Sequence, residues 1–390
     1  MNVSSIGKQD CCGCSACMAV CPRDSISMVA DDEGFLYPYV NTSSCVNCGL
    51  CFSTCKDKEK TKIAVMETFA AKNNSTDVIS KSSSGGLSHA ICREIIEAGG
   101  VAYGVAYTSK YEVVIRKAET VNDADIFYGS KYVQANPLNS YRDVRKDLSE
   151  SRKVLFIGTS CYIAGLVSFL EKSKTPIDNL YTVDLICHGV PSPRVFKDYI
   201  KWIEGKKGVV DTFLFRTKKK PWGYGSKNFG CTIKYANGKE ETDTVRSRVF
   251  LTLFFSNNCL RPHCHKCEFA GVDKPADLTV ADYWGCKEEE PDFFTEKGVS
   301  AVIAHTQKGI DLLSKAVELD TKKTTIEKIK KKQGNLNHSS PVAETRDQFW
   351  RDYSVDEFSS IAKKYGAYNL QGFIKNSSAY KLYADLRNKQ

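Results

Sequence analysis

Two spacings of apolar residues alternate along the chain, and they predict different elements. Residues 87–98 carry apolar side chains at helical spacing, and Gly99-Gly100 ends the predicted helix. Strand-like alternation follows at 101–107 and at 112–117. The small residues of 82–86, directly before the helix, are suited either to an anion cradle or to a plain N-cap.

From residue 153 the pattern changes to strand, helix, strand. A buried strand at 154–157 leads into an apolar helix at 162–170, and a second strand covers 180–186. Such units are almost always right-handed, with parallel strands. Cys161 and Cys187 each follow one of these strands, and open α/β sheets bind ligands at the carboxyl ends of their strands. We therefore expect these two cysteines to meet at one site.

The remainder of the chain mixes helices and strands and ends in a helical tail. The predicted elements are a helix at 192–202, a strand at 213–216, a hairpin of 231–235 and 240–245 around Asn237-Gly238, strands at 278–281 and 299–305, and a helix ending near Leu319. In the tail, Ser354 and Glu357 predict a capping box. Residues 325–390 are interpreted as a packing or oligomer-contact extension, which leaves a homo-oligomer open.

Composition and charge exclude some classes of protein. Apolar residues make up 42% of the chain and charged residues 26%, as in ordinary globular proteins. The formal net charge of +9 is modest for 390 residues, and no stretch interleaves basic and aromatic residues, so nucleic-acid binding is not expected. Short lysine runs indicate solvated faces or contact with an acidic redox partner.

The sequence predicts neither a secretory signal nor a membrane span. Residues 1–10 lack an apolar run, and no stretch approaches the roughly 18 apolar residues that a membrane span needs. We therefore expect a cytoplasmic protein. In a reducing compartment, the 17 cysteines, an odd number, favour metal or catalytic roles over disulfides.

Eight of the nine cysteines before residue 56 repeat one spacing, C-x2-C-x2-C-x3-C. The first run is Cys11, Cys14, Cys17 and Cys21, and the second run is Cys45, Cys48, Cys51 and Cys55. Two such runs resemble a bacterial ferredoxin with two 4Fe-4S clusters. That resemblance implies that Cys55 completes the cluster of the first run, and that Cys21 completes the cluster of the second. Cys12 is interpreted as a non-ligand.

A further metal centre is predicted from the later cysteines. Cys264-x-x-Cys267 has Cys259 upstream, and we favour a third 4Fe-4S cluster over simple buried thiols. Its expected ligands are Cys161, Cys187, Cys264 and Cys267, with Cys259 as a competitor for one position. Zinc stays open as an alternative because His263 and His265 stand nearby. Cys92, Cys231 and Cys286 have no partners in the sequence and are interpreted as core cysteines.

Six short motifs follow one another between residues 80 and 305. They are Ser84-Gly85-Gly86, Gly129-Ser130-Lys131-Tyr132, Gly158-Thr159-Ser160-Cys161, Cys187-His188-Gly189-Val190-Pro191, Cys264-x-x-Cys267 and Ala281-Asp282-Tyr283-Trp284-Gly285. Together with the ferredoxin runs, they resemble the beta subunit of the deazaflavin-coenzyme (coenzyme F-420) hydrogenases and dehydrogenases. Family members often have Pro-Cys-Gln where this chain has Ser160-Cys161-Tyr162.

This resemblance implies an α/β fold that binds FAD beside an iron–sulfur cluster. The implied flavin contacts are Ser84, Gly85, Gly86 and Lys131. The implied activity is an oxidoreductase that passes electrons between a low-potential donor of the ferredoxin kind and a small organic acceptor. Two alternatives stay open, namely a subunit of a larger complex that acts on the deazaflavin directly, and an electron-transfer adaptor without a substrate. The loop with Arg216, Lys218, Trp222 and Tyr224 has two interpretations from its local composition. It is either an exposed basic segment or a site for an anionic substrate.

The expected fold class is therefore mixed α/β (α+β). A ferredoxin-like two-cluster domain is expected at 1–62, and the two parts of a beta-subunit-like flavin-binding domain at 66–150 and 151–324. The helical extension, 325–390, completes the chain. No catalytic residue is assigned from the sequence.

Overall fold

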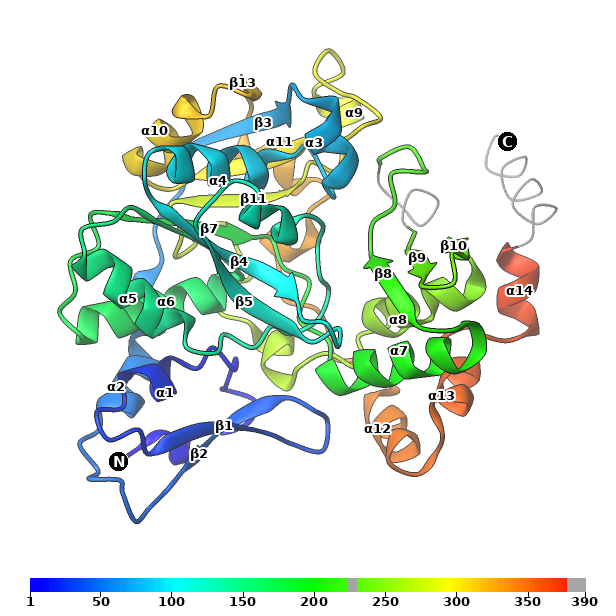
Figure 1. The fold of residues 1–390 in the computed structure, drawn as a ribbon, viewed down its shortest axis with the longest axis horizontal. Coiled ribbons are helices and arrows are strands. Elements are labelled where there is room, and N and C mark those ends of the chain that lie inside the picture. Colours follow the sequence, from blue (N-terminus) through cyan, green and yellow to red (C-terminus); the bar gives the residue numbers. More distant parts are fainter. Residues whose placement is uncertain (224–229, 377–390) are drawn as a thin grey trace.

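A sheet of eight strands crosses the centre of the molecule, in the order β13-β3-β12-β11-β7-β6-β4-β5 (Figure 1). The computed structural model describes residues 1–223 and 230–376. The strands are β3 (Glu67–Asn73), β4 (Val101–Tyr107), β5 (Val113–Ala118), β6 (Val154–Ile157), β7 (Leu180–Leu185), β11 (Leu278–Asp282), β12 (Ser300–Ala304) and β13 (Leu319–Lys323). Strands β4, β6, β7 and β11 are parallel, and the flanking strands pair antiparallel. The predicted parallel pair at 154–157 and 180–186 is confirmed.

Helices pack on both faces of this sheet. The relevant helices are α3 (Thr76–Lys81), α4 (Leu87–Glu97), α5 (Ser140–Ser149), α6 (Ser160–Lys172) and α10 (Gln307–Lys315). Leu155 of β6 belongs to the core under α4 and α10, whereas the next residue, Phe156, belongs to the core under α5 and α6. Because successive side chains of a strand point to opposite faces, one apolar run serves both cores.

A smaller lobe stands beside the main sheet (Figure 1). Its three-stranded sheet, in the order β10-β9-β8, consists of β8 (Val210–Leu214), β9 (Thr232–Tyr235) and β10 (Glu240–Thr242). The Asn237-Gly238 hairpin is confirmed, and Gly238 has φ +80°. The helices of this lobe and the tail are α7 (Pro193–Lys207), α8 (Val245–Phe255), α12 (Arg346–Val355), α13 (Phe358–Lys364) and α14 (Leu370–Asn376).

The N-terminal module consists of a two-stranded ribbon and two short helices. They are β1 (Ile26–Ala30), β2 (Leu36–Val40), α1 (Ala16–Val20) and α2 (Leu50–Lys56), followed by the 3-10 helix η2 (Asp57–Thr61). Helices α1, α2 and η2 pack against α6, so α6 lies between the module and the main sheet (Figure 1). This contact brings the two ferredoxin runs close to the sheet.

Two local predictions were wrong. The helix expected to end near Leu319 ends at Lys315, because Leu319 begins β13 and pairs with Asn73 of β3. The capping box at 354–357 does not form, because Ser354 lies inside α12 and donates its hydroxyl to the Arg351 carbonyl. Glu357 is the N-cap residue of α13 and makes no side-chain cap.

The remaining short helices, α9 (Cys286–Glu289) and α11 (Ile326–Lys330), cover a third small core on the main sheet. Cys92, Cys231 and Cys286 are buried, as expected of core cysteines. Within residues 1–223 and 230–376, no helix has the length and apolar character that a membrane crossing needs.

Candidate metal centres and the carboxyl edge of the sheet

The parallel strands end at one edge of the main sheet, and candidate residues gather there. Cys161 lies in the first turn of α6 directly after β6, and Cys187 follows β7. Asp282 is the last residue of β11, the next parallel neighbour of β7. The expectation that both cysteines stand at strand carboxyl ends is therefore met.

The segment with Cys264 and Cys267 lies against the loop after β7. The backbone N–H of Val190 donates to Cys264 Sγ at 3.4 Å, and Pro191 forms a bridge with Leu260. Burial raises the pKa of the Cys264 thiol, and the neighbouring thiols of Cys187 and Cys267 raise it further. The structure thus brings together three thiols from two segments that are far apart in the sequence.

Cys161 and Cys259 differ in their neighbours. The pKa of Cys161 is raised because its thiol donates a hydrogen bond to Cys12, because it is buried, and because the Cys267 thiol is near. Cys259, in contrast, is fully buried, and its Sγ donates to the Leu253 carbonyl in α8 at 3.4 Å. Cys161 is accordingly the better placed of the two to join the three-thiol group.

A different donor set overlaps with this one. The ligand atoms of His263, Cys267 and Glu268 lie within 4.8 Å of one another. His263 Nε2 is 2.9 Å from Glu268 Oε2, and its Nδ1 is 3.2 Å from the Gln9 carbonyl oxygen. His265, the other candidate, places Nδ1 3.1 Å from the Ser340 carbonyl oxygen instead. Nitrogen, sulfur and carboxylate donors suit zinc, so that alternative stays open for this region.

Three cysteines of the first run, Cys11, Cys14 and Cys17, are buried, and Cys21 is half-buried. The thiol of Cys17 has a raised pKa because it is buried, and the nearby thiols of Cys11 and Cys55 add to the effect. Cys55, at the end of α2, therefore lies beside the first run, as the ferredoxin resemblance implies. A Cβ atom on Gly165 of α6 would come within 2.7 Å of Cys14 Sγ, so this helix leaves just enough room for the run.

The second run lies nearer the surface, although Cys51 is buried. Burial raises the pKa of Cys51, and the neighbouring thiols of Cys48 and Cys21 raise it further. Cys21 thus lies beside the second run, again as the resemblance implies. Cys48 is exposed, and Cys45 is half-buried. Four neighbouring cysteine thiols form the donor set of a 4Fe-4S cluster, so both ligand sets fit such a cluster.

Cys12, interpreted as a non-ligand, lies between the first run and Cys161. The cysteine spacing could not predict this position. It is 3% exposed, and hydrogen bonds with the thiols of Cys14 and Cys161 lower its pKa. Lys58 Nζ donates to Cys12 Sγ at 3.1 Å. Cys12 therefore connects the first run to the cysteine at the carboxyl edge.

The loop before α4 rests on the main sheet. Ser84 Oγ donates to the Val299 carbonyl at 2.9 Å, and the Gly85 N–H donates to Ser300 Oγ at 3.2 Å. A Cβ atom on Gly85 would lie 2.6 Å from the Ala71 carbonyl oxygen of β3. Gly86 is the N-cap residue of α4 with φ +79°. These glycines are therefore required by close packing and by the turn.

Two lysines beside this loop bind backbone carbonyls. Lys131 Nζ donates to the carbonyls of Ile126 and Tyr128, both at 2.9 Å. Lys218 Nζ donates to the Ser84 carbonyl at 3.0 Å. Burial lowers the pKa of Lys131 to about 7 and that of Lys218 to about 8. Within residues 1–223 and 230–376, neither ammonium forms an ion pair with a carboxylate.

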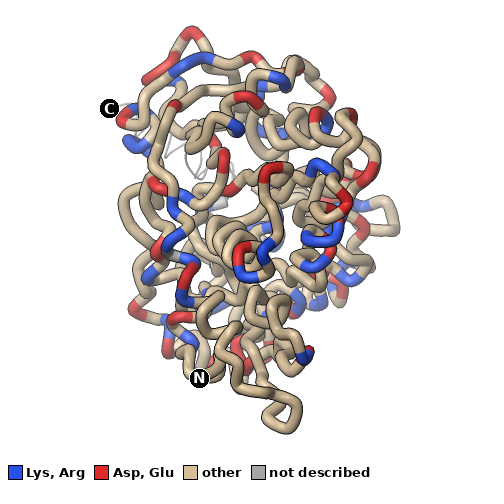
Figure 2. Tube along the Cα trace, turned by 90° about the vertical axis from the view of Figure 1, so that its left-hand side faces the viewer, with Lys and Arg blue, Asp and Glu red and all other residues tan. Residues whose placement is uncertain are grey.

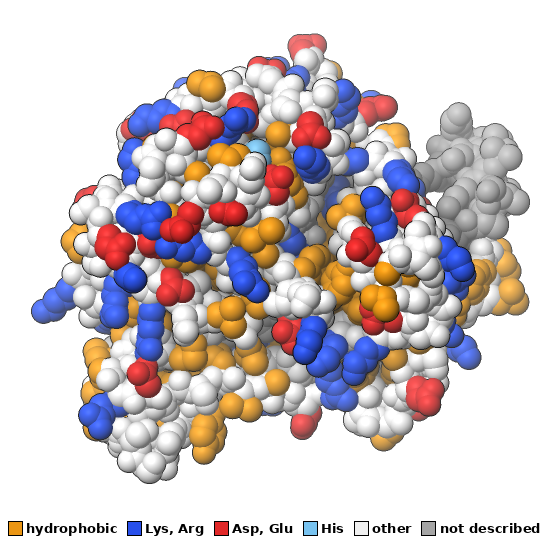
Figure 3. All heavy atoms as spheres, viewed as in Figure 1, with side chains coloured by type: hydrophobic (Ala, Val, Ile, Leu, Met, Phe, Trp, Pro, Cys, Tyr) orange, Lys and Arg blue, Asp and Glu red, His pale blue; other side chains and the backbone are white. Residues whose placement is uncertain are grey.

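The proposed basic loop turns toward the carboxyl edge. Arg216 forms an ion pair with Asp282 at 2.8 Å, and Trp222 Nε1 donates to the same carboxylate at 2.6 Å. Trp222 also stacks on Trp284 at 5.3 Å between ring centroids. Tyr224, the fourth residue expected here, lies outside the described residues. Figure 3 shows the surface hollowed between the main sheet and the lobe of β8–β10, on the side where this loop lies.

Comparison with known proteins identifies two domains. Residues 10–58 match the model of the 4Fe-4S dicluster domain, and residues 151–332 match the model that describes the C terminus of the coenzyme F420 hydrogenase/dehydrogenase beta subunit. The chain joins a 4Fe-4S dicluster domain to a beta subunit domain of this hydrogenase/dehydrogenase family. The beta subunit domain contains Cys161, Cys187, Cys264 and Cys267, and the dicluster domain contains both ferredoxin runs.

One solved structure is similar over most of the chain. It is a chain of the F420-reducing [NiFe] hydrogenase complex from Methanosarcina barkeri, with 15% sequence identity and a TM-score of 0.47. The match covers 80% of this chain and 96% of that chain. No curated protein sequence matches.

The family matches confirm the mixed α/β fold with an N-terminal ferredoxin-like module. The chain is thus an iron–sulfur protein of the oxidoreductase type, related to hydrogenase and dehydrogenase beta subunits.

Proposed function

We propose that the protein is an iron–sulfur flavoprotein oxidoreductase. It passes electrons between a low-potential donor of the ferredoxin kind and a small organic acceptor. The observation that carries this proposal is the succession of thiol groups from the surface to the sheet. Cys48 of the second run is exposed, the first run is buried against α6, and Cys161 begins α6 at the carboxyl edge.

The proposed ligands are the cysteines predicted from the sequence. Cys11, Cys14, Cys17 and Cys55 would hold one 4Fe-4S cluster, Cys45, Cys48, Cys51 and Cys21 a second, and Cys161, Cys187, Cys264 and Cys267 a third. Bound clusters supply one-electron transfer, and bound FAD exchanges single electrons for a hydride. Reduced thiolate ligands of this kind suit a cytoplasmic protein.

The proposed flavin contacts are Ser84, Gly85, Gly86 and Lys131. Support comes from the lysines more than from the glycines, because Gly85 is explained by its packing against β3. Lys131 is half-buried, and its ammonium donates to two backbone carbonyls. An anionic group of the cofactor would supply the counter-charge that such a site lacks.

Two further candidates rest on particular observations. The match of residues 151–332 favours a subunit that acts on the deazaflavin directly, within a larger complex. The grouping of His263, Cys267 and Glu268 favours zinc in place of the third cluster. In either case the chain would still receive or deliver electrons through the dicluster domain.

Anaerobic purification with quantification of iron, sulfide, zinc and flavin tests these proposals. About twelve irons and one FAD per chain would support three clusters and the flavoprotein. About eight irons with one zinc would support the zinc alternative. About eight irons without flavin or zinc would leave an electron-transfer adaptor and refute the flavoprotein.

Lys131→Met tests the flavin site separately. We expect it to lower flavin content, whereas Lys110→Met, at an exposed turn, should not.

The same lysine predicts a pH dependence of stability. The unfolded chain keeps the lysine proton to about pH 10, whereas the folded chain loses it near pH 7. The free energy of unfolding of flavin-free protein should therefore rise with pH between these values. Lys131→Met should remove this rise, which thermal unfolding at pH 7 and 9 would measure. Wild-type flavin content in this variant would contradict the assignment.

A further inference from the structure

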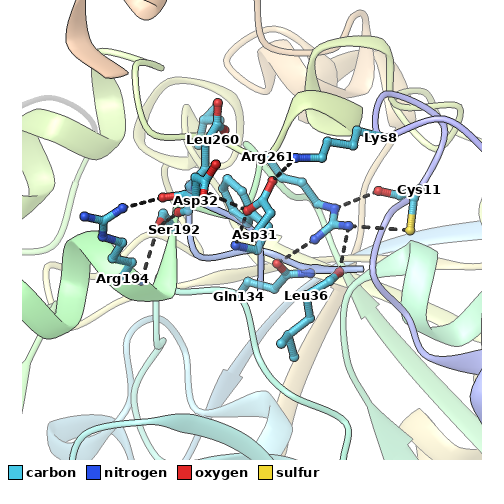
Figure 4. A network of polar contacts seen from close by, with 12 residues as sticks. Lys8, Cys11, Asp31, Asp32, Leu36, Gln134, Ser192, Arg194, Leu260 and Arg261 are labelled. Carbon is cyan, nitrogen blue, oxygen red and sulfur yellow. Dashed lines mark hydrogen bonds and ion pairs between the residues drawn. The ribbon is translucent and has the colours of Figure 1, made fainter. Parts of the chain in front are cut away.

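Two buried cations lie against the first run. Arg261 is 0% exposed, and its Nε donates to the Cys11 carbonyl at 2.7 Å (Figure 4). Its Nη2 lies 3.5 Å from Cys11 Sγ. On the other side, Lys58, 2% exposed, donates to Cys12 Sγ at 3.1 Å. Both positive charges are therefore held within hydrogen-bond distance of thiols in the ferredoxin module.

Neutral partners satisfy the rest of the Arg261 guanidinium. Nη1 donates to Gln134 Oε1 at 2.9 Å, and Nη2 donates to the Leu36 carbonyl at 3.0 Å (Figure 4). The Tyr37 ring lies 4.2 Å from Cζ. Within residues 1–223 and 230–376, neither Arg261 nor Lys58 forms an ion pair with a carboxylate. A buried cation without a counter-charge is costly, so the anionic partner of this pair is the first run with its bound group.

Among the described residues, the other ligand set, Cys45, Cys48, Cys51 and Cys21, has no equivalent. Asn2 Nδ2 lies 3.9 Å from Cys45 Sγ, and the Ser25 N–H donates to Cys21 Sγ at 3.4 Å. In the part of the chain that the structure describes, no lysine or arginine donates to a thiol of this group. The two ligand sets thus differ in electrostatics although they share one cysteine spacing.

We propose that Arg261 and Lys58 are positioning residues that raise the reduction potential of the cluster held by Cys11, Cys14, Cys17 and Cys55. The inference rests on the proposed function, in which both runs hold 4Fe-4S clusters. Reduction adds one negative charge to a cluster, and a nearby cation favours that state. Burial acts in the opposite direction, because a desolvated site disfavours added charge. The two cations offset this effect at the buried run.

The consequence is a direction for transfer inside the module. With both clusters bound, the raised potential would favour transfer of one electron from the cluster of Cys45, Cys48, Cys51 and Cys21 to that of Cys11, Cys14, Cys17 and Cys55. No bond or proton would change place. Arg261 comes from the segment that also carries Cys264 and Cys267. The beta subunit domain therefore sets the potential of a cluster in the dicluster domain.

An anaerobic redox titration of the full chain, followed by electron paramagnetic resonance, tests the proposal. Lys58→Met and Arg261→Met should each lower the potential of one cluster and leave the others unchanged. Arg261→Lys, which keeps the charge, should retain most of the wild-type potential. Lys60→Met is the matched control, because Lys60 lies on the same 3-10 helix but is exposed, and it should change no potential. The Cys48→Ser variant shows which reduction step of the titration belongs to the cluster of the second run, because that step should be lost.

The outcomes separate the inference from its premise. Wild-type protein without 4Fe-4S signals would overturn the proposed function itself. Signals present, with all potentials unchanged in Lys58→Met at wild-type iron content, would overturn only the role of the cations. If Arg261→Met fails to fold, Lys58→Met and Arg261→Lys still test the proposal. An unchanged reduction potential in Lys58→Met contradicts it.

Discussion

The two cysteine runs share one spacing but lie in opposite surroundings. Helices α1 and α2, which carry parts of both runs, pack against α6, but only the first run lies against two buried cations, whereas Cys48 of the second run is exposed. From residue 34 to residue 55 the chain carries no charged side chain, and the N-terminal module is mostly tan in Figure 2. Spacing therefore indicates the ligand chemistry of a run, whereas segments far away in the sequence determine its electrostatic surroundings.

The largest expected difference between the runs is in stability. Cys17→Ser should remove the buried cluster and leave Arg261 and Lys58 without their anion, which costs on the order of 3–5 kcal/mol. Cys48→Ser should also lower iron content, but with a much smaller fall in Tm, because its cluster faces solvent. Anaerobic thermal unfolding with iron analysis measures both. Equal losses of Tm in the two variants would show that the surroundings do not matter.

A smaller effect is expected from crowding the buried run. Gly165→Ala places a Cβ atom 2.7 Å from Cys14 Sγ, and overpacking of this kind typically costs about 1–3 kcal/mol. Gly205→Ala in α7 is the matched control, because its Cβ meets no atom within 4 Å. That control should raise stability by about 0.5–1 kcal/mol through helix propensity. A Gly165→Ala protein as stable as Gly205→Ala would refute the close approach of α6 to the first run.

The smallest effect on stability is expected at the exposed run. Val46 is 60% exposed in the uncharged surface, so Val46→Lys and Val46→Glu should change the free energy of unfolding by no more than about 0.5 kcal/mol. With an acidic donor protein, the lysine variant should accelerate reduction and the glutamate variant should slow it, because rim charges act on association rates. Val209, equally exposed but in the distant lobe, provides the control. Stopped-flow reduction at low salt measures both sets of variants. Equal changes of rate at Val46 and at Val209 would argue against electron entry at the second run.

The sequence predicted the elements that depend on local pattern. The strand–helix–strand unit with Cys161 and Cys187 and the hairpin at Asn237-Gly238 formed as expected. Both cysteine runs could be recognised because their cysteines lie close together in the chain. Arg261 and Lys58 could not be found in this way, since their importance arises from folding across as many as 250 residues. The same reason explains β13, which forms because β3 offers it an edge, and not because of its own pattern.

The position of β3 in the sequence also determines the order in which strand pairings can form while the chain is synthesised. This strand, residues 67–73, hydrogen-bonds to β12 on one side and to β13 on the other. Both partners lie more than 220 residues downstream, so a growing chain leaves both edges of β3 open until residues 300–323 have left the ribosome. The N-terminal module can complete its own short-range pairing long before that moment. The Arg261 guanidinium, in contrast, reaches the Cys11 carbonyl only after the segment around residue 261 has been synthesised.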